Sequence, residues 1–599
     1  MFFKKIIVAT LLLPVVIVTE SKTVQTPVEK SFMEYERFQG PKEKQIIRTA
    51  PPFVIPVSTQ RELNDLSNNI RKAIKNGKKE IEVRISSGVY YYEKLPVYLY
   101  NLDAKNVSIS IVGNNTIMVA GGKDYSGGKL VQSPDKDKVY LDNNRNPIDI
   151  YGDVQWASAP VEVLNQNTGE CRLLIGTKKE YMEGLKIQLS EWYLSPVYDV
   201  SSIKDEYVYF IANDIKYDKA KKCFNVNYDY GMGDNNPRFR FIEPGLVLNS
   251  KTSIHECEVS QFLILYRSKI KSFSVSGIDF LGCAKGKDAL IYFRDVEAEK
   301  ISISNCKFEQ IKYKIVKLRN TENFVFRDNI VRNCFDGAVY SYVDCPSTIV
   351  KNNIFYRAEM GWTNSSCVAC YGKDFSIADN VFEDISYASI VSGFLYAWGK
   401  KIVGCGVIER NSIFYGEEYY NNPWKYTLYD SGAIYIGTQN KLVIVRYNDI
   451  HNYRGVRSKR GIYCDEGAMN VKIYGNVISG ITNAHSLFSW RDRSMNKKLS
   501  ASNDGIEVFY NLIWGNYKFD ERPNSSCIHG KNIILYADGE EAPKNELTNF
   551  AYKEKDIVFS GVTKRNGRIE LPSKAIQQLR QFPTYEKMKT ILEKAGFSH

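Results

Sequence analysis

The sequence lacks the marks of several protein classes. Only 19 of its 599 residues are proline and 40 are glycine, while 44% are hydrophobic, which excludes disordered, collagen-like and low-complexity chains. Lysine and arginine exceed aspartate and glutamate by 80 − 68 = 12 charges, and this small excess, spread along the chain, does not make a nucleic-acid footprint. After the N-terminal segment, no apolar run approaches the length of a membrane span. We therefore expect a folded protein with no nucleic-acid partner and no membrane span.

Motifs for cofactors and metals are missing as well. No glycine-rich phosphate loop leads into a helix, and no serine-hydrolase elbow or metal-chelating helix is present. Cys367 and Cys370 have the spacing of a metal-site pair, but no second Cys or His pair accompanies them. Other cysteines, such as Cys306 and Cys464, stand in or beside hydrophobic β segments, where a small thiol packs well. The sequence thus predicts neither a metal nor a cofactor.

Residues 1–20 predict a secretory signal peptide. Lys4 and Lys5 form a charged start, and an apolar core interrupted by Pro14 follows from Ile6 to Val18. This core is too short to span a bilayer comfortably. We therefore expect an exported protein, periplasmic or extracellular.

A recurring motif organises the chain from about residue 270. It reads apolar-x-apolar-x-x-Asn-x-apolar, and its intervals of 24 to 37 residues are typical of a solenoid widened by loop insertions. Short strands with no helical pattern between them predict an all-β fold, a right-handed parallel β-helix. Asparagine suits the bend because it tolerates left-handed backbone and its stacked amides can bond from coil to coil. The motif places asparagines at Asn305, Asn329, Asn353, Asn380, Asn411, Asn448, Asn476 and Asn511.

The regions outside the repeats predict additions to the solenoid. An amphipathic helix starting near Ser58 or Thr59 would cover the open first coil, whose backbone groups are otherwise unpaired. A second amphipathic helix, from Ser573 to Ala595, would cap the other end. The predicted division is a signal peptide (1–20), an N-terminal cap with the first coils (21–121), an inserted β module (122–250), the β-helix core carrying the site (251–545) and a C-terminal segment with its capping helix (546–599).

Tyrosines stand out along one predicted strand of each coil. Period-two alternation turns Ile434 and Ile462 inward and Tyr435 and Tyr463 outward, so an aromatic stripe with acids beside it is expected on one outer face. Tyrosine suits sugar rings, although any β-rich surface collects it. Long loops flank this face, at 415–429 and 451–460, and long loops on a rigid scaffold commonly carry binding.

Two motifs on this face resemble a known family. They are Asp430-Ser-Gly-Ala-Ile-Tyr and, one coil later, Gly461-Ile-Tyr-Cys-Asp465-Glu466-Gly-Ala. The pair resembles that of β-helix carbohydrate enzymes of the pectate-lyase superfamily, especially glycoside hydrolases of the family 141 and family 120 type. The resemblance covers residues 270–520 and, more weakly, the leader helix and the inserted module. It implies a glycosidase whose catalytic carboxyls are Asp430 and Asp465, with Glu466 as a substitute.

Glycoside hydrolysis needs two carboxyls. One is protonated to assist the leaving oxygen, and the other is ionised to attack the anomeric carbon or to activate water. Asp465 is expected to point outward, and Asp492, one coil further on, is an alternative partner to Asp430. The residues predicted to bind the carbohydrate are Tyr435, Tyr463, His485, Trp490, Arg491 and Asp492.

Two other functions stay open. A polysaccharide lyase of this architecture would act on a uronate polymer, with His451, Lys459 or Arg460 near the same face as its base. The acidic clusters that would mark a calcium site are not evident. A non-catalytic glycan-binding solenoid would also present an aromatic stripe. In each case the expected partner is an oligo- or polysaccharide, neutral or acidic.

Overall fold

The computed structural model describes most of residues 35–120, 261–393, 404–419, 431–489 and 505–536, with short gaps inside these ranges. It also describes isolated strands between residues 123 and 256 and between 550 and 570. The chain divides into two units, residues 1–39 and 40–599, and the β-helix belongs to the second.

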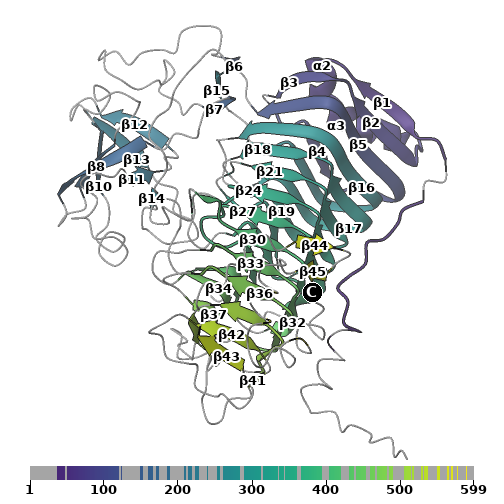
Figure 1. The fold of residues 1–599 in the computed structure, drawn as a ribbon. Coiled ribbons are helices and arrows are strands. Elements are labelled where there is room, and N and C mark those ends of the chain that lie inside the picture. The colour runs from purple at the N-terminus through teal and green to yellow at the C-terminus, as the bar shows by residue number, and fades with distance from the viewer. Residues whose placement is uncertain are drawn as a thin grey trace, which may run out of the picture. The chain divides into compact units, whose positions relative to one another are not determined.

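Short parallel strands form a coil that repeats along the second unit. From β18 to β39, each strand pairs with the strand three places later in the chain, so that like strands stack into three parallel sheets (Figure 1). In each coil a strand of sheet 3 is followed by one of sheet 1 and then one of sheet 2. The long strands β5 (Asp103–Ala120), β16 (Leu263–Cys283) and β17 (Ala289–Ser304) bend through more than one sheet.

Besides segments of these long strands, each sheet contains its own short strands. Sheet 1 contains β1 (Phe53–Val57), β2 (Glu80–Ile85), β20 (Phe324–Arg327), β23 (Thr348–Lys351), β26 (Phe375–Ala378), β29 (Gly404–Glu409), β32 (Asn440–Arg446), β35 (Val471–Tyr474), β38 (Glu507–Phe509) and β41 (Ile528–Gly530). Sheet 2 contains β3 (Gly88–Tyr92), β18 (Lys307–Ile311), β21 (Ile330–Arg332), β24 (Ile354–Tyr356), β27 (Val381–Glu383), β30 (Ser412–Phe414), β33 (Asp449–His451), β36 (Val477–Ser479), β39 (Leu512–Trp514), β42 (Ile533–Tyr536) and β43 (Phe550–Lys553). Sheet 3 contains β4 (Val97–Tyr100), β19 (Lys314–Thr321), β22 (Val339–Ser341), β25 (Val368–Cys370), β28 (Ile390–Ser392), β31 (Ser431–Ile436), β34 (Lys459–Cys464), β37 (His485–Ser489) and β40 (Asn516–Lys518).

The inward side chains of all three sheets fill one hydrophobic core. Phenylalanines stack from coil to coil along it, with centroid separations of 5.1 Å for Phe280–Phe308 and 4.7 Å for Phe355–Phe382. Parallel strands whose inward positions are branched or aromatic bury a continuous interior, which supplies most of the stabilisation of a solenoid. Several cysteine side chains are buried in this interior: Cys306, Cys334, Cys345, Cys367, Cys370, Cys405 and Cys464.

A ladder of buried asparagines runs between sheets 1 and 2. Each amide donates to the side-chain oxygen of the next, over 2.9–3.1 Å, and that oxygen also accepts the backbone N–H of the asparagine before it. The ladder satisfies backbone and amide groups that would otherwise be buried without partners. Its members are Asn329, Asn353, Asn380, Asn411, Asn448, Asn476, Asn511 and Asn532.

The structure separates the two roles expected of these asparagines. The left-handed bend is taken by the residue before the ladder asparagine, with φ of 56° at Asp328, 55° at Asn352 and 56° at Tyr447. Asn305, expected in the ladder, itself occupies the left-handed position with φ of 52°, and Cys306 takes the ladder place beside Asn329. The ladder position predicted from the sequence is therefore off by one residue in this coil.

Two short helices cover the first coil, as predicted. They are α2 (Gln60–Asn64) and α3 (Leu66–Lys75), and Thr59 forms a capping box with Glu62 at the start of α2. Leu63, Leu66 and Ile70 on these helices are fully buried. The helices contact β1, β3 and β4, so they cover interior side chains that the first coil would expose.

Separate strands, paired antiparallel except for β10 with β13, lie in the sequence between β5 and β16. One seven-stranded sheet has the order β12-β13-β10-β9-β8-β11-β14, and a three-stranded sheet the order β6-β15-β7. The bounds are β6 (Lys123–Asp124), β7 (Asp149–Gly152), β8 (Ala159–Asn165), β9 (Glu170–Leu173), β10 (Leu185–Gln188), β11 (Val208–Phe210), β12 (Asp214–Asp218), β13 (Cys223–Asn227), β14 (Phe239–Arg240) and β15 (Thr252–Glu256). Near the C-terminus β44 (Thr563–Arg565) pairs with β45 (Arg568–Glu570). The predicted helix at 573–595 lies almost wholly outside the described residues, and the domain division stays a prediction.

Candidate functional site

The motif strands β31 and β34 lie side by side in sheet 3. Their register pairs Ile434 with Ile462 and Tyr435 with Tyr463. The isoleucines join the core inside the coil, whereas the tyrosines belong to a second cluster on the outer side of the sheet. The period-two alternation therefore holds in these strands.

The outer cluster is packed rather than open. It consists of the side chains of Tyr340, Ala369, Tyr371, Tyr387, Ala388, Val391, Tyr435 and Tyr463. Tyr435 is 4% exposed and Tyr463 is 3% exposed, so the solvent-facing aromatic stripe expected from the sequence is not what these two tyrosines form. Their contact with a carbohydrate stays a prediction.

Asp465 stands directly after β34, on the outer side of sheet 3. Its N–H donates to the carbonyl of Ile436 over 2.8 Å, and its carbonyl accepts the N–H of Ala468 over 2.9 Å, so both backbone groups are fixed. Its carboxylate accepts a hydrogen bond from the Tyr435 hydroxyl. Burial, and then the nearby charge of Asp465, raise the pKa of Tyr435 well above its ordinary value. Tyr435 is therefore a protonated donor, and a hydrogen bond donated to a carboxylate favours the ionised form.

A cation completes this layer. The Arg460 guanidinium lies 4.0 Å from the centroid of the Tyr463 ring, and that ring meets Tyr435 edge-on with centroids 4.7 Å apart. Arg460 is buried, and in this environment a cation over an aromatic face is held by the quadrupole of the ring. Arginine keeps its proton in proteins, so Arg460 offers charge rather than a base.

His451 does not lie on this face. It ends β33 in sheet 2, where its ring stacks on Phe414 at 4.9 Å and its Nδ1 lies 3.1 Å from the Asp449 carboxylate. The expectation that His451 sits near the face of Asp465 is wrong. It is the last residue of β33, and the pairing of β33 with β30 and β36 in sheet 2 fixes it there.

The other predicted residues are placed only in part. His485 begins β37, and its backbone pairs in register with Arg460, while its side chain lies outside the described residues. The residues that lie wholly outside them are Asp430, Glu466, Trp490, Arg491 and Asp492.

The sequence analysis missed two buried carboxylates between sheets 2 and 3. Glu359 is fully buried and accepts the N–H of Tyr387 over 2.7 Å. Asp384, 2% exposed, accepts the N–H of Gly416 over 2.8 Å. Both acids tie one turn to the next, and the only signal for them was an acidic residue a few places after a sheet 2 strand.

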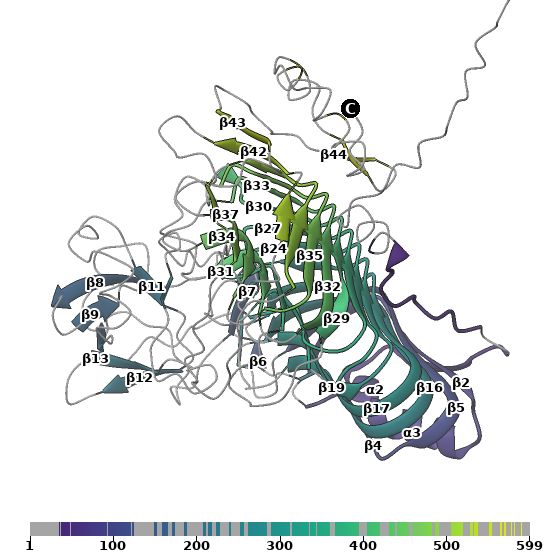
Figure 2. The ribbon, with the colours of Figure 1, turned by 90° about the horizontal axis from the view of Figure 1, so that it is seen from below.

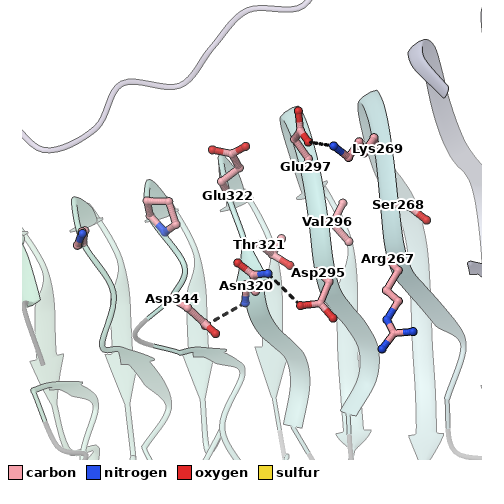
Figure 3. Close-up of a pocket in the computed structure, with 12 residues that line it drawn as sticks. Arg267, Ser268, Lys269, Asp295, Val296, Glu297, Asn320, Thr321, Glu322 and Asp344 are labelled. Atoms are coloured by element: carbon pink, nitrogen blue, oxygen red, sulfur yellow. Dashed lines mark hydrogen bonds and ion pairs between the residues drawn. The ribbon is translucent and has the colours of Figure 1, made fainter. Parts of the chain in front are cut away.

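A groove at the corner from sheet 3 to sheet 1 was also missed. It has a volume of about 880 Å³ and runs over several early coils. Figure 3 shows its paired groups: Lys269 lies 2.9 Å from Glu297, and Asn320 bridges Asp295 and Asp344 with two bonds of 2.9 Å. The hydrogen bond from Lys269 lowers the pKa of Glu297. These polar residues occur singly between apolar repeats, so no sequence motif predicts the groove.

Within the described ranges, no three His, Cys, Asp or Glu side chains are grouped to hold a metal ion. Cys367 and Cys370 are fully buried, and burial raises the pKa of both thiols, which favours their neutral form. No helix in the described part of the chain is long and apolar enough to cross a membrane.

The family-model comparison supports the fold. A family model described as "Right handed beta helix region" matches residues 236–407, and no curated protein matches the chain. Three similar solved structures are a glycoside hydrolase (9% identity, TM-score 0.39, 80% of this chain and 96% of that one), PfbA, a surface adhesin of Streptococcus pneumoniae (9%, 0.39, 86% and 94%), and a hyperthermoactive exopolygalacturonase from Thermotoga maritima (10%, 0.34, 85% and 91%). Similarity at this level carries no activity over to this chain. Together with the strand pairing, the family model confirms the predicted architecture: the chain folds as a right-handed parallel β-helix.

Proposed function

We propose that the protein is a carbohydrate-active enzyme that hydrolyses a glycosidic bond, with Asp465 as its ionised carboxylate. The observation that carries the proposal is the Tyr435 hydroxyl donating to the Asp465 carboxylate on the outer side of sheet 3. This bond holds one carboxyl charged and oriented, as required for attack on the anomeric carbon or activation of water.

The roles then divide between two carboxyls. Asp465 is the nucleophile or base, and Tyr435 positions it without touching the reacting atoms. The protonated partner is one of Asp430, Glu466 and Asp492, the acids expected on the same face. Because Asp465 is only 7% exposed, the substrate must displace whatever shields the carboxylate, and the aromatic surroundings then strengthen its field.

Hydrolysis suits this geometry better than lyase chemistry. A lyase needs a base that removes a ring proton, but Tyr435 is held protonated and Arg460 cannot lose its proton. His451 faces away with sheet 2, paired with Asp449. A carboxylate that is charged and hydrogen-bonded is the group that the described residues do offer.

We also propose that the protein is exported. The charged start and short apolar core at residues 1–20 support it, and a polysaccharide substrate is found outside the cytoplasm. Fractionation of expressing cells tests it: the protein should be recovered outside the cytoplasm, shortened at its N-terminus.

The test of the activity is Asp465→Asn, assayed on a panel of neutral and acidic polysaccharides. We expect release of reducing ends to fall at least about 100-fold, because the substitution removes the charged group of the reaction. Asp336→Asn is the matched control, since Asp336 is also 7% exposed and pairs with Lys314 at 2.8 Å, yet lies outside the site. The control should keep its activity if it folds by circular dichroism.

Three results would contradict the proposal. Asp465→Asn with full activity would remove Asp465 from the reaction. Products that absorb in the ultraviolet through a new double bond would show a lyase. Retained binding with no product in the wild-type protein would show a glycan-binding solenoid.

A further inference from the structure

A second surface of sheet 3 lies in the first coils, far from Asp465. Its outward side chains here are partly or fully accessible, and Tyr98 and Tyr100 on β4 are 41% and 43% exposed. Figure 2 shows β4, β17 and β19 side by side at this end of the β-helix. We name this surface the tyrosine–cation face: Tyr98, Tyr100, Tyr266, Tyr292, Arg294, Lys317 and Arg319.

The register aligns these side chains in two rows across the strands. In one row Tyr100 lies beside Tyr266, which lies beside Arg294 on β17. In the other, Tyr292 lies beside Lys317 on β19. With about 4.8 Å between strands, the three steps from β4 to β19 span about 14 Å, so the face is a continuous strip along the solenoid axis.

Cations sit over the aromatic rings of the face. The Arg294 guanidinium lies 5.2 Å from the centroid of Tyr266, and Lys317 Nζ lies 5.3 Å from that of Tyr292. At the capped end, Arg71 of α3 lies 4.3 Å from the Tyr100 ring. A cation and a ring at this distance attract each other, and together they offer a flat apolar surface beside a positive charge.

The face differs in charge from its neighbours. None of the eight outward positions on the four strands is a carboxylate; the eighth is Ile264. On sheet 2, by contrast, outward Lys307 and Arg332 both meet Glu309, at 3.1 and 2.7 Å. Arg294 also lies 3.6 Å from Asp295 of the corner groove, but Arg294, Lys317 and Arg319 outnumber this carboxylate, so the residues of the tyrosine–cation face carry an excess of positive charge, which fits an anionic ligand.

We propose that the tyrosine–cation face binds an acidic polysaccharide, a chain whose sugars bear uronate or sulfate groups. Sugar rings lie on the tyrosines, and the acidic groups meet Arg294, Lys317 and Arg319. The face precedes β34 by five coil steps from β19, about 24 Å, so it is distinct from the site at Asp465. The inference concerns binding and stands whether or not Asp465 is catalytic.

Single-stranded nucleic acid is also anionic and stacks on aromatic rings. Three cations over four strands are few for a backbone with a phosphate at every nucleotide, and the whole chain carries a net charge of only +12 over 599 residues. The observations therefore favour the polysaccharide, and nucleic acid becomes an outcome of the test.

The experiment measures binding of polygalacturonate to the full chain by calorimetry, in the Asp465→Asn background so that the probe is not cut. The double variant Lys317→Gln, Arg319→Gln should lose at least about tenfold in affinity, because two charge-assisted contacts are removed. The control Arg84→Gln, Lys105→Gln removes the same charge from side chains 61% and 60% exposed elsewhere on the early coils, and it should bind like its parent. Circular dichroism establishes that both variants fold.

A further control variant tests whether the corner groove contributes to polygalacturonate binding by the tyrosine–cation face. Glu322→Gln removes one negative charge from the groove of Figure 3 and should leave the affinity unchanged. The proposal is overturned by unchanged affinity in the double variant, by equal losses in the control, by a tenfold gain in Glu322→Gln, or by equally tight binding of neutral dextran or of oligothymidylate.

Discussion

The outer side of sheet 3 uses tyrosine in two different ways. In the early coils Tyr98 and Tyr100 are exposed at 41% and 43%, and cations accompany the rings. In the later coils Tyr371, Tyr435 and Tyr463 are at most 4% exposed and pack against one another and small apolar residues. The strand geometry is the same in both regions, so the difference arises from what covers the sheet.

This difference separates the two proposed functions along one scaffold. An open strip of rings and cations can hold a ligand without rearrangement. A buried layer can instead fix the direction of one charged group, as Tyr435 does for Asp465. A solenoid accommodates both because each coil contacts mainly its neighbours, so distant coils can diverge in their outward residues.

The largest expected contrast is in stability. Tyr371→Ala should lower the free energy of unfolding by about 3–5 kcal/mol, because it empties a packed site where the ring meets Tyr340 at 5.4 Å. Tyr98→Ala should lower it by only about 1 kcal/mol or less, since the side chain is already 41% exposed. Urea denaturation followed by circular dichroism measures both. Equal losses in the two variants would erase the distinction between the two regions.

The next effect is on activity at the buried region. Tyr435→Phe keeps the ring but removes the donor to Asp465, and a hydrogen bond to a charged group contributes about 1.5–3 kcal/mol, so turnover should fall roughly 10- to 100-fold. Because the ionised carboxylate loses support, the acid limb of the pH–activity profile should move to higher pH. Tyr371→Phe, in the same outer cluster but not among the predicted site residues, is the control, and it should shift neither. An unchanged profile in Tyr435→Phe would mean that Tyr435 only fills space.

The architecture could be predicted from the sequence because its signals are local. The Asn motif and the period-two alternation are readable within single coils, and both appear in the structure as the ladder and the sheets. The position of the left-handed residue was harder to read, because asparagine occupies both places in pairs such as Asn352–Asn353. In the coil of Asn305 this ambiguity shifted the predicted ladder position by one residue.

Coverage of a face could not be predicted in the same way. Tyr292 and Tyr463 both follow a core isoleucine on a sheet 3 strand, yet Tyr292 is partly exposed and Tyr463 is 3% exposed. The residues that bury a ring come from elsewhere in the chain, so they cannot be predicted from the sequence of the strand itself. For the same reason the sequence suggested an open sugar platform at Tyr435 and Tyr463 and overlooked the open one that begins at Tyr98.

The smallest expected effect tests whether an ion pair with a carboxylate keeps outward cations from binding the polysaccharide. On sheet 1, Glu43 lies 2.8 Å from both Lys300 and Lys351, in coils on either side of Arg327, which lies 3.3 Å away. Burial alone would raise the pKa of Glu43, but hydrogen bonds and charges of the two lysines lower it to about 2. A carboxyl whose pKa is lowered on folding stabilises the protein above its ordinary value of 4.5, and this contribution is lost as the pH falls toward 2.

Glu43→Gln should therefore cost about 1 kcal/mol or less at neutral pH, since the group is partly in water, and the difference from wild type should vanish near pH 2. It should also free Lys300 and Lys351 and raise the affinity of this surface for polygalacturonate, while Arg327 stays paired with Asp328. Denaturation at a series of pH values measures the first effect, and calorimetry in the Lys317→Gln, Arg319→Gln background measures the second. If removing Glu43 left polygalacturonate binding unchanged, an excess of positive charge would not be enough to attract the polymer, and the tyrosines of the tyrosine–cation face would have to supply the selectivity.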